Sequence, residues 1–141
     1  MVSRLKKTLL WGCCALAGAA GAQQANPLIG EWRGVMRSAD NYNIAFDVTY
    51  YPNNTFVQSL AVPPSRESGT GSGIIYSRGQ YRMTSDHTVE WNVQETKMCP
   101  GGDMSFCSTM PSGGVQTISF RMEGADKVVN TDNGTVAYRV R

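Results

Sequence analysis

Apolar and polar side chains alternate with a period of two along most of the chain, which is typical of half-buried β-strands. The clearest case is the segment 42–51, YNIAFDVTYY. Its larger apolar positions fall on one face: Tyr42, Ile44, Phe46, Val48 and Tyr50. No long segment shows the period of 3.6 residues that marks an amphipathic helix. The pattern therefore predicts an all-β protein.

The same alternation predicts further strands, separated by turn-forming residues. They span 55–62, 74–77, 79–84, 88–97, 115–122, 127–131 and 135–141. Tight turns are expected at Pro52–Asn54, Ser85–His87 and Asp132–Gly134, and two longer loops at 63–73 and 98–114. About eight strands with mostly short connections favour an antiparallel meander. Such a meander closes into an up-and-down barrel, which removes exposed sheet edges.

The first 22 residues resemble an export signal rather than part of the fold. Basic residues precede the apolar run Thr8–Leu16, and Ala20 and Ala22 place small side chains where a signal peptidase cleaves. The run is about half as long as a membrane-spanning helix. We therefore expect a periplasmic or secreted protein with one domain, residues 23–141. In the alternative, Leu10–Cys13 is a lipobox, and lipidation at Cys13 would attach the chain to a membrane.

The charge balance changes once the signal is removed. Without Arg4, Lys6 and Lys7, the 13 basic side chains become 10 against 11 acidic ones, so a net charge of +2 becomes −1. A nearly neutral domain offers no electrostatic attraction for nucleic acid or for an anionic membrane. We therefore predict that neither is a partner of the mature domain.

Two cysteines remain in the mature chain, Cys99 and Cys107. An even pair in an oxidising compartment predicts one disulfide, which would close the loop CPGGDMSFC. A closed zinc site requires four ligands, and two cysteines with the single histidine are too few. No metal site and no cofactor are expected.

Gly30 and Trp32 form a Gly-x-Trp at the start of the first expected strand. Together with the strand pattern, LIGEWR (28–33) resembles the first motif of the lipocalins and the wider calycin group. The resemblance implies that Trp32 plugs the closed end of the barrel, that Gly30 allows tight packing, and that an arginine of the last strand lies over the indole. Arg139 and Arg141 share one face of that strand, so periodicity does not choose between them.

If the barrel holds a ligand, its inward-facing apolar residues line the pocket. The predicted ligand-binding residues are Phe46, Val48, Tyr50, Trp91, Phe120 and Tyr138, with Ile118 and Tyr81 as further candidates. In the alternative, these side chains simply fill the core.

Residues for catalysis are scarce. His87 is the only histidine and falls in an expected turn, and the mature chain has no spare thiol for a nucleophile. The sequence predicts no enzyme but a carrier of a small apolar or amphipathic molecule. As an alternative, Ser72–Tyr76 is similar to the Ser-Gly-x-x-Tyr element of periplasmic lysozyme inhibitors. That resemblance implies an envelope protein as partner, bound through the loops 63–73 and 98–114.

Overall fold

The computed structural model of this 141-residue chain describes residues 26–39, 41–64 and 71–141. The expected signal at 1–22 and the lipidation alternative at Cys13 lie outside the described residues. Within the described part, no helix is long and apolar enough to cross a membrane.

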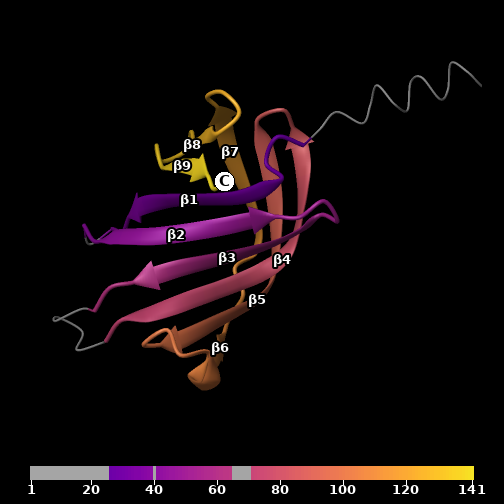
Figure 1. Ribbon diagram of the computed structural model, residues 1–141. Coiled ribbons are helices and arrows are strands. Elements are labelled where there is room, and N and C mark those ends of the chain that lie inside the picture. Colours follow the sequence, from indigo (N-terminus) through magenta and orange to yellow (C-terminus); the bar gives the residue numbers. More distant parts are fainter. Residues whose placement is uncertain (1–25, 40, 65–70) are drawn as a thin grey trace, which may run out of the picture.

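Nine strands and one short helical turn build the described chain (Figure 1). The strands are β1 (Gly30–Arg37), β2 (Asn43–Tyr50), β3 (Thr55–Val62), β4 (Gly73–Ser85), β5 (Thr88–Pro100), β6 (Ser108–Met110), β7 (Gly114–Met122), β8 (Lys127–Asn130) and β9 (Val136–Arg139), with the 3-10 turn η1 (Met104–Phe106) before β6. Neighbouring strands are antiparallel throughout. Because β9 returns to pair with β1, the sheet closes on itself. The predicted antiparallel up-and-down barrel is confirmed.

Two strands share one edge of β5, so the closed ring has eight positions rather than nine. Met110 of β6 pairs with Thr96, and Gly114 of β7 pairs with Val93. Three residues, 111–113, therefore stand opposite two on β5. Strands β6 and β7 together behave as one strand interrupted by a bulge.

The structure corrects two boundaries. The segments 74–77 and 79–84, expected as separate strands, form the single strand β4, with a register shift between Arg78 and Gly79. A Cβ at Gly79 would lie 2.0 Å from the backbone oxygen of Asn92, so only glycine fits where β4 bends toward β5. The expected loop 98–114 is also more ordered than predicted, since it contains η1 and β6.

The closed end of the barrel is filled by aromatic rings. Phe56 and Trp91 stack with ring centroids 4.3 Å apart, and Tyr50 meets Tyr81 edge to face at 4.8 Å. Each such pair contributes about 0.5–1.5 kcal/mol beyond its burial of apolar area. Trp32 is fully buried beside them, and its Nε1 donates to the oxygen of Leu28 at 2.8 Å. Arg139, not Arg141, lies over its ring.

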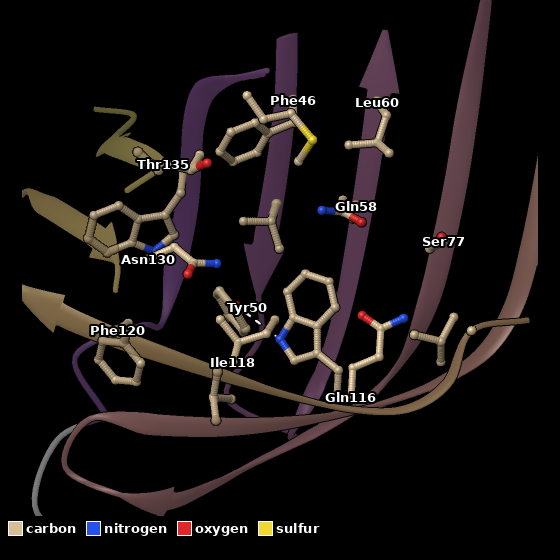
Figure 2. A pocket seen from close by; sticks show the side chains of 18 of the residues that line it. Phe46, Tyr50, Gln58, Leu60, Ser77, Gln116, Ile118, Phe120, Asn130 and Thr135 are labelled. Atoms are coloured by element: carbon tan, nitrogen blue, oxygen red, sulfur yellow. Dashed lines mark hydrogen bonds between the residues drawn. The ribbon is translucent and has the colours of Figure 1, made fainter. Parts of the chain in front are cut away.

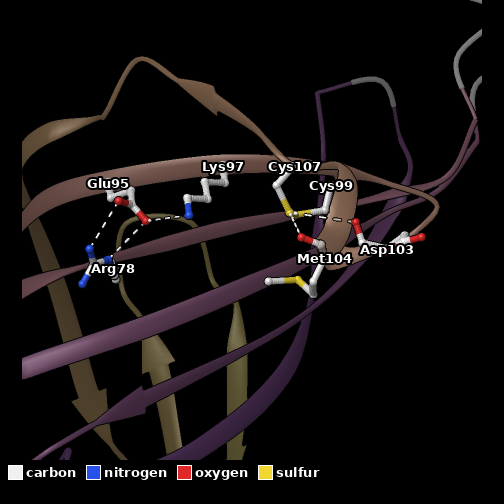
Figure 3. A network of polar contacts seen from close by, with 7 residues as sticks. All are labelled: Arg78, Glu95, Lys97, Cys99, Asp103, Met104 and Cys107. Atoms are coloured by element: carbon white, nitrogen blue, oxygen red, sulfur yellow. Dashed lines mark hydrogen bonds and ion pairs between the residues drawn. A yellow bond between two sulfur atoms is a disulfide. The ribbon is translucent and has the colours of Figure 1, made fainter.

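The predicted disulfide between Cys99 and Cys107 is present (Figure 3). It ties the end of β5 to the residue that follows η1. Asp103 caps η1 by accepting a hydrogen bond from the backbone nitrogen of Ser105 at 2.9 Å. The bridge and the cap together fasten this loop to the end of β5.

Four residues before Cys99 on β5, Glu95 lies between two cations, as Figure 3 shows. Arg78 donates to Glu95 from Nε at 3.2 Å, and Lys97 lies 3.4 Å away. The hydrogen bond from Arg78 is the main reason that the pKa of Glu95 lies below its usual value. These side chains are exposed, so the network belongs to the outer surface of the barrel and not to its interior.

Candidate ligand-binding cavity

A cavity of about 480 Å³ lies inside the barrel, within the range that small-molecule sites occupy. Trp32 and Leu28 line its buried end, beside the plug. At the opposite end its lining residues are exposed to solvent and so mark the mouth: Pro111, Gly113, Gln116 and Asn133. The mouth is therefore framed by the bulge before β7 and by the turn between β8 and β9.

Five of the six predicted ligand-binding residues line this cavity: Phe46, Val48, Tyr50, Trp91 and Phe120. Ile118, a further candidate, lines it as well. Figure 2 shows Phe46 across the cavity from Phe120 and Ile118. The alternation along β2, β5 and β7 thus brought the expected apolar side chains together, and they leave space between them.

Tyr138 does not line the cavity, and the prediction that it faces inward is wrong. Its side chain is 57% exposed, whereas Ala137 is 5% exposed and lines the cavity. Successive side chains of a strand point to opposite faces. Ala137 and Arg139 therefore share one face of β9, and Tyr138 lies on the other. Because Arg139 lies over the buried Trp32, the face of Tyr138 is the outer one. Tyr81 is buried but is not among the described lining residues.

A set of polar side chains completes the lining, and the sequence analysis missed it. These residues are Gln58, Ser77, Thr96, Gln116, Asn130 and Thr135. The sequence did contain a signal for them. Gln58 lies two residues from both Phe56 and Leu60, so it falls on the same apolar face of β3. Gln116 continues the face of Ile118 and Phe120 in the same manner. A polar residue at an inward position of an apolar face predicts a hydrogen-bonding group in the interior.

The amide of Asn130 has a defined orientation. Its Oδ1 accepts hydrogen bonds from the backbone nitrogens of Asp132 at 2.8 Å and Asn133 at 3.3 Å. These two bonds hold the turn between β8 and β9, and they assign the oxygen and the nitrogen of the amide. The Nδ2 group is left to serve the cavity as a donor, and Figure 2 shows it directed toward the interior.

Tyr50 presents a second donor, deeper in the barrel. Trp91 Nε1 donates to the Tyr50 hydroxyl oxygen at 3.1 Å, and both residues are buried (Figure 2). The indole nitrogen can only donate, so the hydroxyl is the acceptor in this pair. No acceptor for the hydroxyl proton of Tyr50 lies within hydrogen-bonding distance among the described residues. Burial raises the pKa of Tyr50 well above its usual value of 10.0, so the hydroxyl stays protonated at physiological pH.

The described residues that line the cavity include no charged side chain. Within the same part of the chain, no group of three or more His, Cys, Asp or Glu could hold a metal ion. His87 is exposed in the turn between β4 and β5. The arrangement therefore offers a largely apolar surface with hydrogen-bond donors and acceptors at a few positions.

The element Ser72–Tyr76, which resembles a motif of lysozyme inhibitors, does not project from the barrel in the described structure. Gly73, Ile74, Ile75 and Tyr76 belong to β4 and pair with β3 on one side and β5 on the other. Their backbone groups are engaged in the sheet. Residues 73–76 are therefore strand rather than loop, while residues 65–70 of the expected contact loop 63–73 lie outside the described residues.

Comparison of the sequence with models of protein families gave no match. Comparison with curated proteins gave none either.

Proposed function

We propose that this chain is a lipocalin-like carrier that binds a small apolar or amphipathic molecule inside its barrel, without catalysis. The observation that carries the proposal is the cavity of about 480 Å³ that begins at Trp32 and reaches solvent near Gly113 and Asn133. A core that served stability alone would be filled to the density of a protein interior, with few voids larger than a water molecule.

The lining also fits such a ligand. Phe46, Val48, Trp91 and Phe120 supply apolar and aromatic surface, which favours burial of hydrocarbon. The amides and hydroxyls between them would fix the orientation of a polar group, as is usual in small-molecule sites. An amphipathic molecule with its apolar part toward Trp32 satisfies both features.

The proposed compartment is the periplasm or the extracellular medium. The expected signal at 1–22 and the disulfide between Cys99 and Cys107 support it, because disulfides persist in oxidising environments.

Uptake of the neutral fluorophore N-phenyl-1-naphthylamine tests the proposal, because its emission rises on transfer from water to an apolar site. Leu60 lines the cavity, so Leu60→Trp should fill part of it and weaken uptake about tenfold or more. Ala61→Trp is the matched control, since Ala61 is the exposed neighbour on the same strand. Equal uptake by both variants, or none by the wild-type protein, would reject a ligand cavity.

A second candidate function, binding to an envelope protein, is favoured by one surface feature. Met104 and Phe106, both in η1, are 57% and 72% exposed on the loop that the disulfide holds. Large apolar side chains on an ordered loop are typical anchors of protein interfaces. Native mass spectrometry of protein from its own envelope compares the candidates: a bound small mass supports the carrier, and a protein partner lost in Phe106→Ser supports the interaction module.

A further inference from the structure

We propose that the cavity selects an uncharged ligand that carries a carbonyl or ether oxygen, and that this oxygen accepts a hydrogen bond from Tyr50 at the buried end. The inference rests on the proposed carrier function and specifies the chemistry of its ligand. Tyr50 is then a specificity-determining residue, because its hydroxyl would donate a hydrogen bond to the ligand oxygen.

The position of Tyr50 places its hydroxyl at the base of the cavity. Tyr50 pairs with Gly30 across β1 and β2, two residue pairs beyond the level of Trp32 and Val48 toward the closed end. Its ring is 7% exposed and packs against Tyr81 and Trp91. A hydroxyl held this firmly cannot turn to bulk water for a partner, so an unused donor here favours a ligand acceptor.

The direction of the hydrogen bonds makes this end of the cavity a donor. Trp91 can only donate, and it occupies the Tyr50 oxygen as acceptor. The Tyr50 proton therefore remains for the ligand. Asn130 adds a second donor, because its oxygen is bound by the backbone of the turn between β8 and β9 and only its nitrogen faces inward. Two donors that have no acceptors of their own among the described residues match a ligand oxygen better than an ammonium or hydroxyl donor.

The absence of charge among the described lining residues argues against an ion. A carboxylate or ammonium that enters the cavity loses its hydration, and none of these residues offers an opposite charge in return. Neutral donors recover only part of that cost. Tyr50 itself remains neutral, since burial holds its pKa above the usual value. A ligand group that is polar but uncharged avoids the penalty and keeps the hydrogen bond.

Competition against N-phenyl-1-naphthylamine at neutral pH separates these ligand classes with three probes of similar chain length. Decan-2-one is neutral with a carbonyl acceptor, decanoate is anionic and decylamine is cationic. We expect decan-2-one to displace the fluorophore at a concentration about tenfold or more below that of either ion. Displacement by decanoate as effective as that by the ketone would overturn the inference, while uptake of the fluorophore would still support the carrier.

Tyr50→Phe tests the residue. Loss of one neutral hydrogen bond should weaken binding of decan-2-one about fivefold more than it weakens uptake of N-phenyl-1-naphthylamine, which carries no oxygen acceptor. Tyr81→Phe is the matched control, because it removes a buried phenol hydroxyl that serves Tyr51 and Asn26 outside the cavity. An equal loss of ketone affinity in both variants, or none in Tyr50→Phe, would overturn the role of Tyr50.

Discussion

The guanidinium of Arg139 lies over the indole of Trp32, with its Cζ 4.3 Å from the ring centroid. The same guanidinium donates from Nη2 to the oxygen of Pro27 at 2.9 Å and from Nε to the oxygen of Ala125 at 3.1 Å, and its Nη1 donates to the oxygen of Ile29. One side chain of β9 therefore covers the buried tryptophan and also ties the segment before β1 to the turn between β7 and β8. The closed end is held by a cation–π contact and three hydrogen bonds together.

Arg139→Lys should destabilise the protein, because an ammonium cannot reproduce the planar fork that serves three separate carbonyls. We expect the free energy of unfolding to fall by about 1–3 kcal/mol, which urea denaturation measures. Arg141→Lys is the matched control: Arg141 is largely exposed and pairs with Asp126, so its change should stay near zero. Equal effects at the two positions would contradict the assignment of Arg139 to the plug.

Gly30→Ala should destabilise the same end for two reasons. Gly30 has a φ of 125°, a conformation that side-chain-bearing residues rarely adopt, and a Cβ there would lie 2.6 Å from Nη1 of Arg139. We expect a loss of about 1–3 kcal/mol in thermal or urea unfolding. Gly71→Ala is the comparison, since no atom lies within 4 Å of the position its Cβ would take. A neutral Gly30→Ala would show that the motif does not require glycine.

Much of the barrel was predictable because each strand carries its own signal. The alternation along β2 and β5 gave their inward faces, and Asp132–Gly134 gave the last hairpin, as the antiparallel pairing of β8 with β9 bears out. The exception is β4, which was expected as two strands on either side of Arg78. Arg78 pairs with Glu95 and Gly79 with Val93, so the extra residue of this bulge is Gln94 on β5, and β4 itself runs on without a break.

The candidate site was predictable only in its apolar part. Faces of single strands identify residues such as Phe46 and Trp91, but whether they leave a cavity depends on how several strands pack at once. The hydrogen bond of the Tyr50 hydroxyl could not be predicted from the sequence for the same reason, since its partner Trp91 is 41 residues away. Tyr138 was misplaced although both arginines expected to reach Trp32, Arg139 and Arg141, lie on the opposite face of the same strand. Using one face assignment to constrain the next residue would have excluded it.

Removal of the disulfide in the double variant Cys99→Ala/Cys107→Ala should lower the free energy of unfolding by about 2–3 kcal/mol. The bridge spans a sequence separation of 8 residues, and opening it restores conformational freedom mainly to the unfolded chain. Urea unfolding of the wild-type protein with and without a phosphine reductant provides the control, because reduction should lower its stability to a similar extent and leave the double variant unchanged. A reductant effect that persists in the double variant would mean that the bridge is not its cause.

Tyr50 should make the protein sensitive to alkali. Burial is the largest cause that raises the pKa of Tyr50 above the ordinary 10.0, and the nearby Tyr81 adds to it, while the hydrogen bond from Trp91 opposes it. Above pH 10 the unfolded chain therefore releases the Tyr50 proton and the folded chain retains it. Its contribution to stability is complete below that pH and is lost as the pH rises further, by about 1.4 kcal/mol for each pH unit.

Urea unfolding at a series of pH values, with tyrosinate absorbance as a second signal, measures this loss. Tyr50→Phe should be less stable than the wild-type protein at neutral pH, because the indole N–H of Trp91 loses its acceptor. Above pH 10, however, its stability should fall less steeply with pH, since the variant has no hydroxyl to ionise at this position. The pKa of Tyr81 is also raised by burial, so some dependence remains in the variant. Parallel pH profiles for the two proteins would show that the Tyr50 hydroxyl is accessible to water, and would contradict the closed, apolar base on which the proposed ligand chemistry depends.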